Sequence, residues 1–148
     1  MSDLRDLYQE VIFDHNRNPR NFGPLEGYTH KADGFNPLCG DKLTVYLKVG
    51  EDGAITDVSF QGAGCAISMA SASLMTEALK GKPVEVAEQL FQGFHGLIMD
   101  KPVAGAELGK LMVLEGVKEF PSRVKCATLS WHTMHAALEQ KGEAVTTE

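Results

Sequence analysis

The chain passes from a predicted strand to a predicted helix at residues 62–68, Gly-Ala-Gly-Cys-Ala-Ile-Ser. Before this stretch, apolar and polar residues alternate over 55–60, which is typical of a strand. After it, residues 66–80 are rich in Ala, Leu, Met and Ser, and a glycine and a proline follow, a pattern that predicts a helix. Cys65 is therefore expected at a helix N-terminus, where free N–H groups and the helix dipole favour a thiolate.

The strand over 55–60 is expected to pair with a strand over 43–49 in an antiparallel hairpin. Residues 51–53, Glu-Asp-Gly, form the predicted turn between them. Asp41 precedes the first of these strands and Cys65 follows the second. Hairpin topology alone therefore brings Asp41 and Cys65 to the same end of the sheet.

Apolar periodicity and turn residues predict the other elements. Residues 91–105 are interrupted by glycines and a proline, so no structure is assigned to them. We expect a helix over about 4–16, an irregular loop over 17–28, a short strand over 28–33, a turn over 36–41, a helix from Pro83 to about Leu90, a helix over 106–119 that Pro121 ends, a last helix over 127–140 that Cys126 starts, and a polar tail over about 142–148.

Length and composition predict a single globular domain that spans 1–148. The 148 residues are 43% hydrophobic and 23% charged, which is sufficient for a buried core. No apolar run approaches the ~18 residues of a membrane span. The charged N-terminus lacks a signal sequence, so we expect no membrane partner and a cytoplasmic location. The net charge of −6 argues against a nucleic-acid partner.

The cysteines Cys39, Cys65 and Cys126 are odd in number, so they cannot form a complete set of intramolecular disulfides. Metal ligation, thiol reactivity and simple core packing are the three alternatives. With Asp41, two residues after Cys39, they would supply the four ligands of a tetrahedral zinc site, and thiolates also suit iron–sulfur chemistry. Their spacing is not that of a zinc finger, and Asp41 could equally cap its own turn, so the spacing leaves these alternatives open.

Two cations precede the third cysteine, at Arg123 and Lys125. A positive charge near a thiol stabilises its thiolate or persulfide, and Arg123 is the better candidate because its segment carries few other charges. Lys125 is expected to be solvated. His132 and His135 have an i, i+3 spacing that can bind metal, but their place beside a tryptophan favours a structural or surface role.

Four motifs occur in order along the chain: Asp-His-Asn-Arg-Asn-Pro-Arg-Asn at 14–21, Asn-Pro-Leu-Cys-Gly-Asp at 36–41, Gly-Ala-Gly-Cys-Ala-Ile-Ser-Met-Ala-Ser at 62–71 and Arg-Val-Lys-Cys-Ala at 123–127. Together they resemble the U-type iron–sulfur cluster assembly proteins. Within this family the chain is more similar to the SufU branch than to the IscU branch, because Lys125 stands where IscU proteins have a histidine. The segment of IscU that a dedicated chaperone binds is also absent, so that chaperone is not an expected partner.

The resemblance implies an α/β (α+β) fold, with a small antiparallel sheet and helices packed on one face. It implies that Cys39, Asp41, Cys65 and Cys126 converge at one exposed end and bind zinc. The implied partner is a PLP-dependent cysteine desulfurase, which would pass sulfur as a persulfide to Cys39 for delivery to downstream cluster assembly machinery. Arg123 would support the electrostatics of the site. The chain would then be a sulfurtransferase-type carrier or scaffold rather than a small-molecule enzyme.

Three alternative functions use the same residues or a subset of them. One is a scaffold that assembles and transfers a labile [2Fe–2S] cluster on Cys39, Cys65 and Cys126. Another is a structural zinc module that mediates protein contacts. The last is an unrelated thiol enzyme with a single nucleophilic cysteine. The lysine in place of a histidine before Cys126 favours the sulfur relay over the scaffold.

Overall fold

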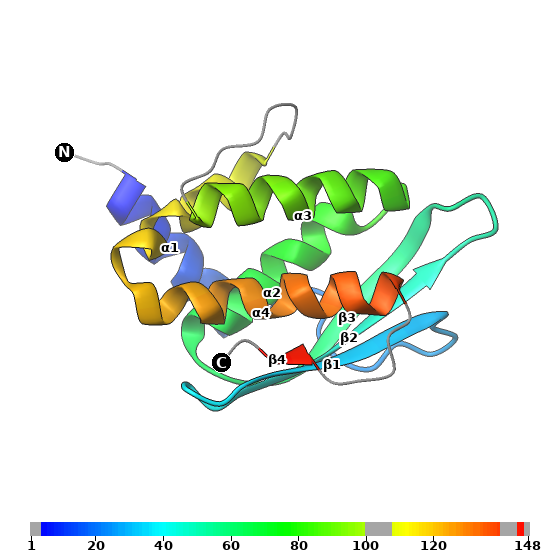
Figure 1. Ribbon diagram of the computed structural model, residues 1–148, viewed down its shortest axis with the longest axis horizontal. Helices are drawn as coiled ribbons and strands as arrows, with labels where there is room; N and C mark the ends of the chain where they lie inside the picture. Colours follow the sequence, from blue (N-terminus) through cyan, green and yellow to red (C-terminus); the bar gives the residue numbers. More distant parts are fainter. Residues whose placement is uncertain (1–3, 100–107, 140–144, 147–148) are drawn as a thin grey trace.

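Helices cover one face of a small sheet in the computed structural model of this protein (Figure 1). The structure describes residues 4–99, 108–139 and 145–146. Its elements are, in chain order, α1 (Leu4–Arg17), β1 (His30–Asn36), β2 (Asp41–Val49), β3 (Ile55–Ala63), α2 (Ala66–Leu79), α3 (Val84–Ile98), the 3₁₀ helix η1 (Gly109–Glu119), α4 (Pro121–Leu138) and β4 (Val145–Thr146). The predicted α+β fold is confirmed. Among these helices, none combines the length and the apolar character that crossing a membrane requires.

Three antiparallel strands form the body of the sheet, in the order β3-β2-β1, and β4 adds to the outer edge of β1. The register of β1 and β2 places Asn36 opposite Asp41, and that of β2 and β3 places Leu43 opposite Gly62. β4 pairs with β1 in parallel, within the segment expected to be a polar tail. The antiparallel sheet is as predicted, with one short parallel strand added.

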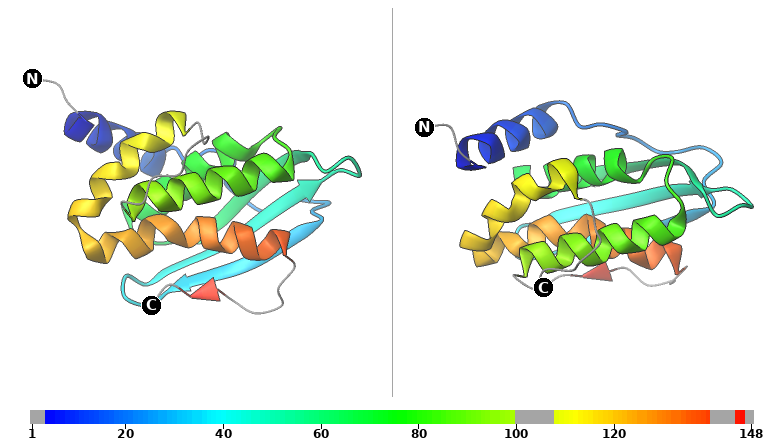
Figure 2. Two further views of the ribbon diagram at one scale, coloured as in Figure 1. Left: turned by 45° about the horizontal axis from the view of Figure 1, so that its top comes forward. Right: turned by 90° about the horizontal axis from the view of Figure 1, so that it is seen from above.

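Alternate residues of the strands face the helices and build the core. Val45 and Phe60 are fully buried on this face, beneath α2 and α4, which lie directly over the sheet (Figure 2). α4 approaches β1 closely at Gly34. The absence of a side chain there permits the approach, since a Cβ atom at this position would collide with the side chain of Thr133. This close approach brings the N-terminal half of α4, including Cys126, onto the end of the β1–β2 hairpin.

The segment 14–21 fastens α1 and the loop after it to α2. His15 is fully buried, and its Nδ1 lies 2.7 Å from Ser73 Oγ. The same oxygen accepts a hydrogen bond from the backbone N–H of Arg20 at 2.8 Å. His15 Nε2 lies 3.6 Å from the carboxylate of Glu77. α1 therefore packs mainly on α2 and η1 and stands away from the sheet (Figure 2).

α3 is longer than predicted. The sequence predicts its end near Leu90, but the helix continues to Ile98. Gly93 and Gly96 lie on its buried side, so tertiary packing outweighs the low helix propensity of glycine. The rest of the unassigned segment, residues 100–107, lies outside the described part of the chain.

The prediction that Cys126 starts the last helix is wrong. α4 begins at Pro121, which occupies the first turn of this helix, so the proline opens α4. Cys126 consequently lies in the second turn, where it is fully buried and does not face the free N–H groups of the helix start. The segment before it also differs from the prediction, because Gly109–Glu119 is a 3₁₀ helix.

Replacing Ser73 by Ala should lower the free energy of unfolding by about 1–3 kcal/mol, because its hydroxyl is the shared partner of the buried His15 ring and the Arg20 amide. Ser130→Ala is the matched control. Ser130 Oγ is also fully buried in a helix, but it has no hydrogen-bond partner in the described part of the chain, so its loss should be nearly neutral. Urea unfolding measures both variants, and equal destabilisation would contradict the anchoring role of Ser73.

Candidate metal centre

Cys39 and Asp41 lie at the end of the β1–β2 hairpin, where the first turns of α4 meet the sheet (Figure 1). β1 runs to Asn36 and does not end near residue 33 as predicted, so the turn contains only residues 37–40. Asp41 is the first residue of β2 and is fully buried on the helix side of the sheet. Cys39 is half-buried in the turn itself. The hairpin therefore presents one candidate ligand inside the protein and one near its surface.

Three of the four predicted ligands form a tight group. The ligand atoms of Cys39, Asp41 and Cys126 all lie within 4.8 Å of one another. Cys126 Sγ is 3.0 Å from Cys39 Sγ, although 87 positions separate the two residues in the sequence. Cys126 is fully buried and Cys39 is not, so α4 forms the inner wall of this centre and the hairpin turn its open side.

Cys65 lies at the edge of this group. It is the N-cap residue of α2, as the sequence predicts, and its backbone N–H donates a hydrogen bond of 2.7 Å to Asp41 Oδ1. Its Sγ lies 4.0 Å from Asp41 Oδ2. The fold thus brings all four predicted ligands to one place from separate segments, with the Asp41 carboxylate between the hairpin and α2.

Two glycines before Cys65 make room for this arrangement. A Cβ atom at Gly64 would lie only 2.5 Å from Asp41 Oδ1. Gly62 has a φ of 141°, and a Cβ atom there would collide with the backbone carbonyl oxygen of Lys42 on β2. The structure shows that Gly64 leaves space for the carboxylate.

Acidic side chains gather at this centre, and no residue in the described part of the chain supplies a buried cation beside them. Asp41 is fully buried, and it makes no ion pair with any residue in the described ranges. Burial raises the pKa of the Cys126 thiol well above its usual range, and hydrogen bonds and charge from its neighbours add to the shift. The negative charge of the Cys65 thiolate raises the pKa of Arg123, whose exposed side chain is the nearby cation. A metal ion binding here would have to displace thiol protons.

Sequence reasoning missed Asn36 as a member of the centre. Its side chain is fully buried, and its Nδ2 donates hydrogen bonds to Asp41 Oδ2 at 3.1 Å and to Cys126 Sγ at 3.4 Å. The alternation along β1 is the signal that could have found it. Ala32, Gly34 and Asn36 share the inward face, so a polar side chain stands in a core position at the strand end.

The paired histidines of α4 lie in a different cluster. The rings of His132 and His135 pack against Phe91 of α3, with centroids 5.4 and 4.8 Å from the phenylalanine ring. Burial lowers the pKa of His132, and the nearby His95 and His135 lower it further. Neither His132 nor His135 belongs to the group of ligand atoms around Asp41.

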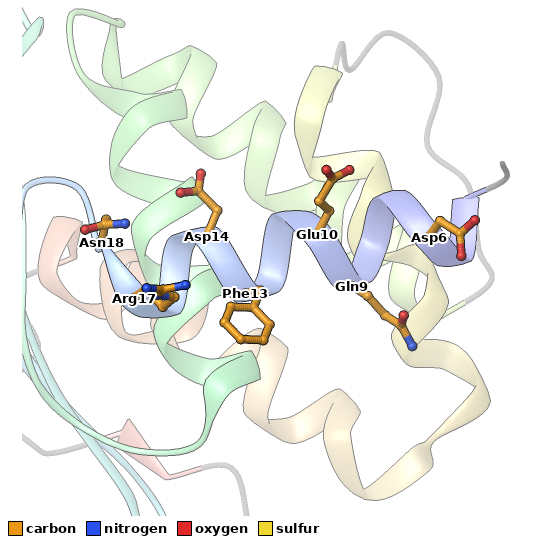
Figure 3. A pocket seen from close by; sticks show the side chains of 7 residues that line it. All are labelled: Asp6, Gln9, Glu10, Phe13, Asp14, Arg17 and Asn18. Atoms are coloured by element: carbon orange, nitrogen blue, oxygen red, sulfur yellow. The ribbon is translucent and has the colours of Figure 1, made fainter.

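A hollow of about 640 Å³ runs along the exposed side of α1 (Figure 3). Its lining comes entirely from that helix and the residue after it: Asp6, Gln9, Glu10, Phe13, Asp14, Arg17 and Asn18. No cysteine is among these residues, so this hollow is separate from the candidate metal centre.

The sequence model of the NifU-like N terminal domain matches residues 7–140, most of the chain. The chain belongs to the NifU-like N-terminal domain family. One relative of this NifU-like protein is the zinc-dependent sulfurtransferase SufU of Bacillus subtilis, which is 41% identical over 141 residues that cover 95% of each chain. Another is the iron–sulfur cluster assembly scaffold protein IscU of Streptococcus pyogenes, 39% identical over 145 residues, 97% of this chain and 90% of the relative. The predicted membership in the U-type assembly family is confirmed.

Solved structures agree with this assignment. A protein assigned as the iron–sulfur cluster assembly scaffold of the SUF system (FiSufU) of Fervidobacterium islandicum AW-1 superposes with a TM-score of 0.84 at 34% identity. That match covers 90% of this NifU-like chain and 98% of the other. The N-terminal part of a NifU-like protein from Brucella abortus shares the fold, with a TM-score of 0.79 at 22% identity.

The donors of this centre fit a zinc ion. Three thiols and one carboxylate are ligand types that zinc takes in tetrahedral protein sites. The buried Asp41 and Cys126 lack a buried cation among the described residues, and a divalent ion would supply that charge. Cys39, Asp41, Cys65 and Cys126 are the residues that could hold it.

Replacing Gly64 by Ala should speed the loss of bound metal roughly 10- to 100-fold, the usual effect of disturbing a residue that orients a ligand, because the added Cβ would displace the Asp41 carboxylate. Ala63→Ser is the matched control, since it adds one atom at the exposed neighbouring position. Transfer of zinc to a chromophoric chelator measures the rate for each variant. A Gly64→Ala protein that releases zinc as slowly as the parent would contradict this role of the glycine.

Proposed function

We propose that this protein accepts persulfide sulfur from a PLP-dependent cysteine desulfurase at a zinc-bound Cys3Asp centre and passes it to the machinery that assembles iron–sulfur clusters. The observation that carries the proposal is the grouping of Cys39, Asp41 and Cys126, with Cys65 at its edge. The name of the Bacillus relative, a zinc-dependent sulfurtransferase, supports it. In this proposal residues 1–148 act as one domain.

Zinc bound by the three thiols and Asp41 would keep the sulfurs deprotonated at neutral pH. Such an ion is especially important for Cys126, because burial raises the pKa of its thiol. A carboxylate is a harder ligand than a thiolate. A metal ion held by Asp41 and three thiolates therefore exchanges a ligand more readily than one held by four cysteines. Such a ligand set suits a protein that must change its coordination during transfer.

Cys39 is the proposed sulfur acceptor because of where it lies. It is half-buried in the hairpin turn next to Leu38, whose side chain is 65% exposed, whereas Cys126 is fully buried. The Cys39 thiolate attacks the outer sulfur of the desulfurase persulfide. A new S–S bond forms on Cys39, the original S–S bond breaks, and the desulfurase cysteine leaves as a thiolate. The step conserves electrons and needs no external oxidant.

Arg123 has a supporting role in this proposal. Its guanidinium is exposed on the first turn of α4 and interacts electrostatically with the thiolates of the centre, most strongly with Cys65. A permanent positive charge at this position lowers the energy of the anionic sulfur that forms on Cys39.

A second candidate function is a scaffold on which a labile [2Fe–2S] cluster is assembled and then transferred. The relative from Streptococcus pyogenes favours it, because that protein is an iron–sulfur cluster assembly scaffold and 39% identical to this chain. The cluster would be cargo held by Cys39, Cys65 and Cys126. Both functions require the same residues, so an experiment has to separate them.

Desulfurase turnover on cysteine should increase severalfold when zinc-loaded protein is added, and protein stripped by a chelator should have no such effect. The physical reason is that Cys39 then removes the persulfide that would otherwise block the next turnover. Sulfide and alanine production measure the rate. Suppression by zinc, with activation by the metal-free or iron-loaded form, would favour the scaffold. No effect from either form would favour a structural zinc module.

Cys39→Ser should abolish transfer of labelled sulfur to this protein, because a serine hydroxyl cannot form the persulfide. In the parent protein, mass spectrometry should locate the added sulfur on the peptide that contains Cys39. The zinc content of the same samples separates loss of the acceptor from loss of the whole centre. Labelled sulfur that persists on the Cys39→Ser variant would contradict the assignment of the acceptor.

A further inference from the structure

We propose that Asn36 is a positioning residue of the metal centre, which holds Asp41 and Cys126 in place while Cys39 leaves to accept sulfur. The inference rests on the proposed function. It assigns a role to a side chain that begins the 36–41 motif but is not one of the predicted ligands.

The geometry joins two ligands through one amide group. Asn36 is the last residue of β1 and the Cα partner of Asp41 in the antiparallel register. Its Nδ2 donates to Asp41 Oδ2 at 3.1 Å and to Cys126 Sγ at 3.4 Å. An amide NH₂ carries two hydrogens, so both bonds can form together. One side chain thus links the sheet and α4 at their two buried ligand atoms.

The unpaired oxygen of this amide indicates why an asparagine occupies the position. Asn36 is 0% exposed, and its Oδ1 has no hydrogen-bond partner in the described part of the chain. A buried acceptor without a partner is unfavourable, so an apolar side chain would pack here at lower energy if packing were the only requirement. Nδ2 must face the Asp41 carboxylate, because an ionised carboxylate only accepts hydrogen bonds. The residue is therefore explained by its donor group.

The contacts of the four proposed ligands are unequal. Asp41 and Cys126 are fixed by hydrogen bonds from Asn36, whereas Cys39 is not. Asp41 accepts hydrogen bonds from Asn36 and from the backbone N–H of Cys65. Cys126 accepts one from Asn36 and lies inside α4. Cys39 touches the centre through the sulfur of Cys126 and lies in the turn. Departure of Cys39 therefore leaves every hydrogen bond of Asn36 intact.

The amide also moderates the charge of the centre. Its N–H dipoles point at a carboxylate and a sulfur that are both anionic when metal is bound. Hydrogen bonds from neutral donors to such ligands fix their orientation and spread their charge without adding a competing cation. Asn36 therefore favours retention of the metal during the interval in which only Asp41, Cys65 and Cys126 hold it.

The test is zinc release to a chromophoric chelator from the full-length zinc-loaded protein, without any desulfurase. Asn36→Leu removes the donor and the unpaired oxygen while keeping the same heavy-atom branching, and Asn36→Asp keeps the shape but replaces the donor by a negative charge. Each should release zinc 10- to 100-fold faster than the parent, and the same factor should appear in a Cys39→Ser background. Gln61→Met is the matched control, because it removes a side-chain amide bonded to Tyr46 on the opposite face of the sheet.

Urea unfolding of the metal-free variants separates this role from a structural one. The positioning role predicts that Asn36→Leu speeds zinc release by more than its loss of metal-free stability accounts for, because the Asp41 carboxylate loses a donor in both states. Parent-like zinc release from both Asn36 variants would overturn the inference and leave the proposed function intact. Release that is accelerated only in proportion to lost stability would also overturn it. A parent protein that takes up no zinc would overturn both proposals together.

Discussion

The arrangement of this centre depends on the groups that compensate the buried charge of the Asp41 carboxylate. A fully buried carboxylate is stable only when hydrogen bonds or a cation compensate its charge. One of its oxygens accepts the backbone N–H of Cys65 and so fixes the start of α2 against the hairpin. The other accepts the amide of Asn36, which also reaches Cys126 on α4. The same carboxylate therefore sets the relative positions of the hairpin, α2 and α4, and with them the positions of all three sulfurs.

Local signals explain which parts of the fold the sequence could predict. The β2–β3 hairpin and the start of α2 follow from alternation, a tight turn and two glycines, all within a few residues of each other. The end of α3 and the start of α4 depend on packing between distant segments. Gly93 and Gly96 are helical because they face neighbouring elements, and Pro121 fits either the end of one helix or the start of the next.

The candidate site also has a part that the sequence could predict and a part that it could not. The family motifs predicted four ligands, and the fold groups Cys39, Asp41 and Cys126 with Cys65 at the edge. The geometry that connects them was not predictable, because the bond between Asn36 and Cys126 joins residues 90 positions apart. The sequence also misplaced Cys126 at a helix N-terminus, which would have stabilised its thiolate through the helix dipole. Its actual place, buried in the second turn, raises its thiol pKa.

These differences make the three sulfurs chemically unequal. Cys65 caps α2, where backbone N–H groups favour negative charge, and Cys39 lies in a turn that reaches the surface. Cys126 has neither advantage, so its thiolate depends on a bound cation and on the hydrogen bond from Asn36. A metal ion is therefore most important for keeping the buried Cys126 thiol deprotonated. In the proposed transfer Cys39 would leave the ion while Asp41 and Cys126 stay ordered, because the hydrogen bonds from Asn36 and from the Cys65 N–H do not involve the turn.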